Sequence, residues 1–186
     1  MILVGKKVIL RSVEEEDLEL LRKSSNSPEF EKMIVGWSFP ISKKNQEEWF
    51  NNCKNDSSNL RYIIETKDDG AVGMISLSNI DWKNGTAYGK GIRVFEGNRT
   101  KGIGTDAWMT LMRYVFNELR LNRIDGSVLD INEISLHLCQ KVGFKIEGTK
   151  RQAAFKDGKY HDVTVVGCLK SDYEKVVEET NYWGEN

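Results

Sequence analysis

Apolar and polar positions change period several times along the chain, and each change predicts an element of secondary structure. From Gly102 to Leu119 the apolar residues recur every three or four positions, as in a helix with one buried face. Short apolar runs bounded by turn residues predict strands elsewhere. The pattern before this helix predicts strand Lys7–Arg11, helix Glu14–Ser25 with a Ser12 cap, a helix from a Ser42 cap to about Cys53, and strands Arg61–Thr66, Ala71–Asn79 and Thr86–Val94. The pattern after it predicts strand Arg123–Leu129, helix Glu133–Val142, strands Lys145–Arg151 and Tyr160–Lys170, and a polar tail over residues 171–186.

The same pattern predicts which side chains are buried and which strands pair. The inner face of the long helix is expected to carry Ile103, Ala107, Leu111, Met112, Val115 and Phe116, and that of the first helix Leu18, Leu20 and Leu21. Asn84-Gly85 and Asp157-Gly158 have the chemistry of tight hairpin turns, so the strands that they join should be antiparallel. The order of elements predicts an α/β fold with a mixed sheet, in one domain over residues 1–186.

Composition narrows the class of protein. The chain has 186 residues, a net charge of −1, 30% charged and 39% hydrophobic residues, so no global basic field favours nucleic acid. No apolar run is long enough to span a membrane, and the first residues do not resemble a signal peptide. Cys53, Cys139 and Cys168 are scattered, which fits a reducing cytoplasm, and His137 and His161 are too few for a histidine metal centre.

The most informative segment lies between the strand Thr86–Val94 and the long helix. A basic, glycine-containing turn there supplies positive charge, bare backbone and a helix N-terminus together, through Arg99, Thr100, Lys101, Gly102, Ile103, Gly104 and Thr105. Glycines let the main chain approach closely, and the N–H groups and dipole of a helix start favour an anion. The segment therefore predicts binding of a phosphorylated cofactor.

Other phosphate-binding motifs fit this turn less well. A Walker A loop requires Gly-Lys-Ser/Thr, but Ile103 follows Gly102. Gly102, Gly104 and Ala107 match a Rossmann fingerprint, yet a polar stretch separates them from the strand, and the unit follows an antiparallel meander. A solvated basic turn that merely starts a helix is the third interpretation.

Three spaced motifs resemble those of the GNAT superfamily of acetyl-CoA-dependent N-acyltransferases, in its RimJ/RimL-like branch. Arg99, Gly102 and Gly104 fit the (Q/R)-x-x-G-x-(G/A) motif. The run from Asn132 to Phe144 is similar to the family's N-x-x-S…G-F segment, and residues 155–162 are similar to its F-x-D-G-x-Y-x-D hairpin. The resemblance covers about residues 7–170. It implies a mixed, mostly antiparallel central sheet flanked by helices on both faces.

The resemblance also implies roles for individual residues. Acetyl-CoA would be the co-substrate, with its pantetheine arm and carbonyl held by the main chain near Ile92 and Val94 and by Asn132. Ser135 is the candidate for protonating the leaving thiolate. Many relatives carry Tyr where this chain has Cys139, so the thiol is a second candidate acid.

The general base is left open by the sequence. Gly89 occupies the position at which many relatives carry Glu, and it has no side chain to act as a base. Glu96, Asp81, His161 or a chain of water molecules are the substitutes. Gly89 and Gly91 also indicate either a bulge or close ligand approach, or simply an irregular strand.

The acceptor is expected to be an amine held opposite the cofactor. Aromatic and acidic residues in the N-terminal half are candidates for the wall of its site: Trp37, Phe39, Asp81, Trp82 and Tyr88. The resemblance implies acetyl transfer by direct attack of a primary amine. A protein N-terminus, a polyamine, an amino sugar and an aminoglycoside all remain possible acceptors. A non-catalytic acyl-CoA-binding protein and a nucleotide-binding regulatory domain are the alternatives, and a homodimer is left open.

Overall fold

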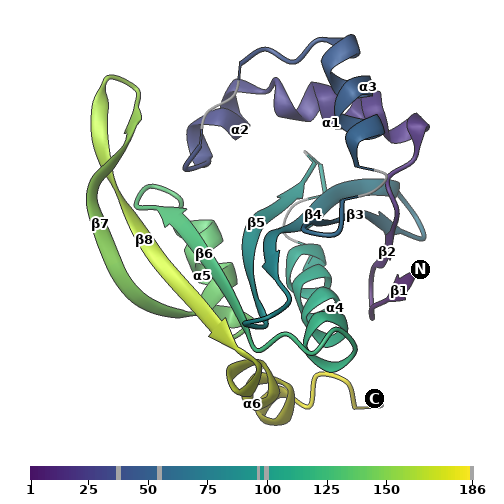
Figure 1. Cartoon of the computed structure of the whole chain (residues 1–186), viewed down its shortest axis with the longest axis vertical. Helices are drawn as coiled ribbons and strands as arrows, with labels where there is room; N and C mark the ends of the chain where they lie inside the picture. Colours follow the sequence, from purple (N-terminus) through teal and green to yellow (C-terminus); the bar gives the residue numbers. More distant parts are fainter. Residues whose placement is uncertain (37–38, 54–55, 96, 99–100, 185–186) are drawn as a thin grey trace.

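Eight strands form one sheet whose order brings the two halves of the chain together. The computed structural model describes residues 1–36, 39–53, 56–95, 97–98 and 101–184. The strands are β1 (Leu3–Val4), β2 (Ile9–Arg11), β3 (Leu60–Thr66), β4 (Gly70–Asp81), β5 (Thr86–Val94), β6 (Arg123–Leu129), β7 (Lys145–Lys156) and β8 (Lys159–Leu169). They lie in the order β1-β2-β3-β4-β5-β6-β8-β7 (Figure 1). The β5–β6 pair is parallel and every other pair is antiparallel, so the predicted mixed sheet is confirmed.

The helices cover both faces of this sheet. They are α1 (Leu18–Ser25), α2 (Pro28–Met33), α3 (Lys43–Asn52), α4 (Ile103–Asn117), α5 (Glu133–Lys141) and α6 (Lys170–Thr180), with a short 3₁₀ turn over Glu15–Asp17. Ile92 and Arg93 are neighbours on β5 and therefore point to opposite faces. Ile92 packs on the core that includes α4, whereas Arg93 contacts α1 and α2. No helix in the described ranges is long and apolar enough to cross a membrane.

The core forms mainly between the sheet and α4. All six residues predicted for the inner face of this helix are at most 3% exposed. In α1 only part of the prediction holds, because Leu21 is 2% exposed but Leu20 is 37% exposed. The predicted Ser42 cap is confirmed, since its side chain accepts a hydrogen bond from the Asn45 N–H. The predicted Ser12 cap is wrong, because the Glu14 N–H is capped instead by the Asp17 carboxylate.

Candidate functional site

The sheet opens where β5 separates from β6. These parallel strands pair at Thr86–Arg123, Ala87–Ile124 and Tyr88–Asp125, and no described residue of β5 beyond Tyr88 pairs with β6. From there β5 pairs only with β4 as far as Val94, while β6 pairs with β8 as far as Leu129. The edge of β5 that faces β6 therefore has main-chain groups without ladder partners. An extended amide chain can bind such an edge as an added strand does.

A bulge in β5 accompanies this divergence. Leu77 pairs with Gly89 and Ser76 with Gly91, so that one residue of β5 is left over at the register shift. Gly91 has φ +108°, a conformation that other residues rarely adopt. A Cβ at Gly89 would lie 2.9 Å from Trp108 Cη2, so the missing side chain makes room for α4 and not for a ligand. Because a bulge bends and twists its strand, it gives a local cause for the opening.

The N-terminus of α4 lies beside this opening. Gly102 is the N-cap in the left-handed region, with φ 79°, and no side chain among the described residues caps the helix. The first intrahelical bond runs from the Asp106 N–H to the Gly102 carbonyl, which leaves the N–H groups of Ile103, Gly104 and Thr105 without helical partners. Three convergent donors and the helix dipole form a site suited to phosphate oxygens. Arg99 and Thr100 lie outside the described residues.

Of the two basic residues predicted for this turn, only Lys101 lies within the described residues. The Lys101 ammonium pairs with Asp69 at 3.1 Å and is directed to that neighbouring turn. Lys7, which the sequence motif does not include, donates to the Lys101 carbonyl at 3.0 Å and lies against Gly102. Lys7 thus adds a cation to this turn that the local motif could not reveal.

Helix α5 brings its candidate residues to the other side of the opening. A Cβ at Gly104 would lie 3.1 Å from Leu138 Cδ2, so α4 and α5 are in close contact at the turn. Asn132 caps α5 by accepting from the Ser135 N–H at 3.1 Å, and its amide nitrogen donates to the Met33 carbonyl at 2.8 Å. Its amide is largely engaged within the protein, so the role for Asn132 in holding pantetheine stays a prediction.

Ser135 and Cys139 follow one another on one side of α5 and are both half-buried. The Cys139 thiol packs on the main core, and burial raises its pKa to about 11. It is therefore protonated at neutral pH. Both residues satisfy the chemical requirement of a proton donor.

A buried histidine pairs with an exposed carboxylate at the C-terminal end of β6. His161 on β8 is 5% exposed, and its Nδ1 lies 2.9 Å from an oxygen of Asp130. Burial alone would raise the pKa of Asp130, but hydrogen bonds from the Asp162 N–H and from His161 outweigh it and lower that pKa. The carboxylate fixes the ring so that Nε2 is the nitrogen left to accept a proton. Of the candidate bases, Glu96 lies outside the described residues.

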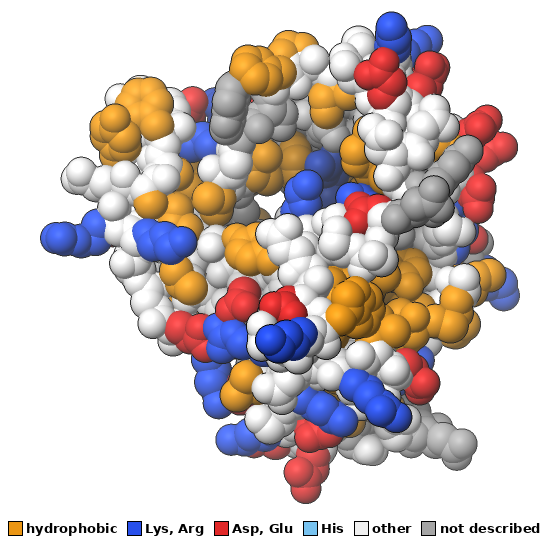
Figure 2. All heavy atoms as spheres, in the orientation of Figure 1, with side chains coloured by type: hydrophobic (Ala, Val, Ile, Leu, Met, Phe, Trp, Pro, Cys, Tyr) orange, Lys and Arg blue, Asp and Glu red, His pale blue; other side chains and the backbone are white. Residues whose placement is uncertain are grey.

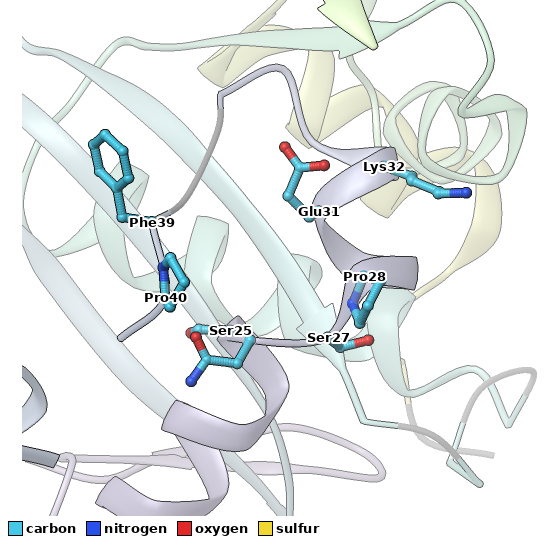
Figure 3. Close-up of a pocket in the computed structure, with 8 residues that line it drawn as sticks. Ser25, Ser27, Pro28, Glu31, Lys32, Phe39 and Pro40 are labelled. Carbon is cyan, nitrogen blue, oxygen red and sulfur yellow. The ribbon is translucent and has the colours of Figure 1, made fainter. Parts of the chain in front are cut away.

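Helix α2 and residues 34–36 after it cover this end of the sheet, and together they are called the roof below. Lys156 is 6% exposed, and its ammonium binds the Glu31 carboxylate and the carbonyls of Glu31 and Gly36. Val35 packs on a small cluster of Leu129, Ala154 and Val163. A pocket of about 320 Å³ lies where α1, α2 and the segment at Phe39 and Pro40 meet, lined mainly by Ser25, Ser27, Pro28, Glu31, Lys32, Phe39 and Pro40 (Figure 3). Figure 2 shows the face below α1 and α2 hollowed, with basic side chains beside the hollow.

The predicted acceptor residues do not all meet at this place. Phe39 lines the pocket, and Tyr88 lies where β5 and β6 diverge. The prediction for Asp81 is wrong, because its carboxylate accepts from the N–H groups of Lys83 and Asn84 within the β4–β5 turn. That turn begins β5, about 20 Å along the strand from Ile92. Trp82 lies in the same turn, with its indole bound to the Ser57 carbonyl. Trp37 lies outside the described residues.

Comparison with known proteins identifies relatives over most of the chain. The family model described as acetyltransferase (GNAT) domain matches residues 7–145. An uncharacterized N-acetyltransferase from the SPbeta prophage of Bacillus subtilis, YokL, is 31% identical over 91% of this chain and 94% of its own length. The putative ribosomal N-acetyltransferase YdaF of B. subtilis is 38% identical over 58% of each chain. A spermidine N-acetyltransferase from Vibrio cholerae, solved with CoA and spermine, has a TM-score of 0.85 at 24% identity and covers 91% of this chain and 99% of its own. This last likeness shows the fold.

Proposed function

The chain belongs to the GNAT family of acetyl-CoA-dependent N-acetyltransferases, and we propose that its acceptor is the primary amine of a small molecule that attacks the thioester directly. The observation that carries the choice of a small acceptor is the roof over the reacting end. Lys156 ties α2 and the segment that follows it to β7, which narrows the approach to the opening. A pocket of about 320 Å³ has the volume of a small-molecule site.

In this proposal the backbone and the helix start hold the acetyl donor. Acetyl-CoA supplies the activated acetyl group. The N–H groups at the start of α4, from Ile103 to Thr105, bind the pyrophosphate, and the free edge of β5 near Ile92 and Val94 orients the pantetheine arm and the carbonyl. Gly102 supplies the left-handed conformation of the N-cap, and Gly104 makes room for Leu138 of α5.

The proposed transfer requires two proton movements. The amine nitrogen forms a bond to the carbonyl carbon as the carbon–sulfur bond breaks, so the nitrogen must lose a proton and the thiolate must gain one. Ser135 is the proposed donor to the thiolate, with Cys139 one turn away as the substitute. His161, oriented by Asp130, is the proposed acceptor of the amine proton, directly or through water.

A turnover assay that detects released thiol tests this proposal. The panel contains small primary amines, among them spermidine, an amino sugar and amino acids, together with peptides that have a free N-terminus. Small amines should be turned over with kcat/KM about 100-fold or more above that of the peptides, since the roof excludes a chain that continues beyond the amine. The variant Gly104→Asp, impaired in cofactor binding, is the control for acetyl-CoA dependence. Faster turnover of the peptides would refute the choice of a small acceptor.

A further inference from the structure

Arg93 places a cation beside the part of β5 assigned to the thioester. It lies between Ile92 and Val94, and its side chain points to the face covered by α1 and α2. Its Nη1 donates to Ser25 Oγ at 2.7 Å and, more weakly, to Ser24 Oγ at 3.4 Å. Its guanidinium carbon lies 3.7 Å from the centre of the Phe30 ring.

The charge of Arg93 lacks a carboxylate partner in the described chain. Its Nε is buried without a hydrogen-bond acceptor. Burial lowers the pKa of Arg93 to about 10, so the group is still charged at neutral pH. Most other partly buried cations have acidic partners: Arg11 with Asp17 and Glu65, Arg61 with Asp56, Arg123 with Asp125 and Glu147, and Lys156 with Glu31. Arg113, like Arg93, contacts an aromatic ring and an uncharged oxygen.

A buried cation without an anion is costly, and two hydroxyls with one ring compensate for only part of the lost hydration. The planar fork of a guanidinium matches a carboxylate or a phosphate, to which it can donate two parallel hydrogen bonds. Arg93 therefore has the chemistry of an anion-binding group, on the face from which an acceptor reaches the opening.

We propose that the acceptor carries an acidic group, a carboxylate or a phosphate, next to its amine, and that Arg93 binds this group. This inference rests on the proposed function. Arg93 and Ile92 are adjacent on β5, so an acid bound to Arg93 holds an amine one or two bonds away near the carbonyl. The same cation repels polyamines, whose charges are all positive. The substrate class is therefore α-amino acids and similar compounds that carry an acidic group next to the amine.

The competing explanation is that Arg93 only braces α1 and α2 against β5 through Ser25 and Phe30. The two explanations differ in one observable. Loss of a residue that only supports α1 and α2 should lower kcat/KM for all acceptors equally. Loss of an acid-binding group should lower kcat/KM only for acceptors that carry the acid. The matched control is Arg113, which also stacks on an aromatic ring, with its guanidinium 3.9 Å from the Trp183 ring centre, and which donates to the Val4 carbonyl.

The experiment compares acceptors that differ only in the acid. An amino acid, its carboxamide, its decarboxylated amine, phosphoethanolamine and spermidine are assayed with the wild type, Arg93→Gln and Arg113→Gln. The wild type should prefer the amino acid over its carboxamide by about 100-fold in kcat/KM, as expected when one partner of a hydrogen-bonded charge pair is removed. Arg93→Gln should reduce this preference to about threefold or less and leave the decarboxylated amine nearly unchanged. Arg113→Gln should retain the preference. Phosphoethanolamine reports whether the acid is a phosphate.

Calorimetric binding of the N-acetylated amino acid to the CoA-bound protein gives a readout that needs no turnover. Loss of this binding in Arg93→Gln, but not in Arg113→Gln, supports the inference even if acetyl transfer to amines is not seen and the proposed function fails. Retention of the acid preference in Arg93→Gln overturns the inference while leaving acetyl transfer intact. An equal loss of kcat/KM for every acceptor in Arg93→Gln would show that Arg93 only holds α1 and α2 against β5, and would overturn the inference. A wild-type preference for spermidine over the amino acid would also overturn it.

Discussion

Replacement of Gly104 by Asp separates steric from electrostatic control of acetyl-CoA binding. Gly104 is the second residue of α4, beside the N–H groups assigned to the pyrophosphate. A new Cβ there would lie 3.1 Å from the Leu138 Cδ2 methyl and 3.8 Å from the Ile92 Cδ1 methyl. Both are ends of flexible side chains that can shift by a few tenths of an ångström. Bulk alone should therefore weaken binding modestly, by about tenfold or less.

The added charge should dominate. A carboxylate about 5 Å from a phosphate charge, at an effective dielectric constant of about 20, costs about 3 kcal/mol. Gly104→Asp should thus bind CoA about 100-fold more weakly than the isosteric, neutral Gly104→Asn. The free protein should respond in the opposite direction, because an acid in the first turn of a helix stabilises it by about 0.3–1 kcal/mol. The Asp variant should therefore melt no lower than the Asn variant.

Calorimetry with CoA and thermal unfolding without it measure both effects. Raising the ionic strength from about 0.05 M to 0.5 M should narrow the affinity ratio between the two variants, since salt screens charges near the surface. Equal CoA affinities of Gly104→Asp and Gly104→Asn would refute the assignment of the phosphates to this turn. An affinity ratio that does not narrow with added salt would contradict the screened electrostatic repulsion proposed here.

The remaining predictions concern proton transfer and the corrected acceptor wall. Ser135→Ala should lower kcat about 100-fold with little change in CoA affinity, whereas Cys139→Ala should be nearly neutral; the reverse result would exchange their roles. His161→Gln should lower kcat about tenfold or more at pH 7 but less at pH 9, where more of the acceptor amine is already neutral, and Asp130→Asn should follow the same trend; a ratio constant across pH would exclude His161 as the base. Asp81→Asn should lower the melting temperature by a few degrees through its turn and leave KM for the amine unchanged; a raised KM would restore Asp81 to the acceptor site.

Apolar periodicity and turn residues predicted those helices and hairpins whose formation depends on neighbouring residues in the sequence. The buried face of α4 follows from its apolar period, and the β7–β8 hairpin from Asp157-Gly158, both of which adopt positive φ. Helix α2 was missed although Ser27 is its N-cap and Pro28 occupies its first turn, where proline is favourable. A Ser-Pro step is equally compatible with a helix break, so the local pattern does not decide between the two. The two-residue strand β1 is too short to have a pattern of its own.

The residues of the site could be predicted only where they lie close together in the sequence. The glycine turn and the α5 residues lie within short motifs, and both reach the opening. Arg93 alternates with Ile92 and looks like an ordinary strand residue, because the lack of an acidic partner is a property of the packed face. Asp81 was placed in the acceptor wall by residue type alone, and its role in the turn depends on neighbours that the type does not reveal.

The turn proposed to bind the phosphates depends on a distant segment of the chain. Asp106 in the first turn of α4 is 1% exposed and accepts hydrogen bonds from the N–H groups of Lys6, Lys7 and Val8. A Cβ at Gly5 would collide with Thr110 Oγ1, so this segment passes directly over the helix. The Asp106 carboxylate thereby fixes the backbone from which Lys7 reaches Gly102. Because Lys101 is paired elsewhere, the cation nearest this turn in the described chain is held there by a contact between residues 99 positions apart, which no six-residue motif contains.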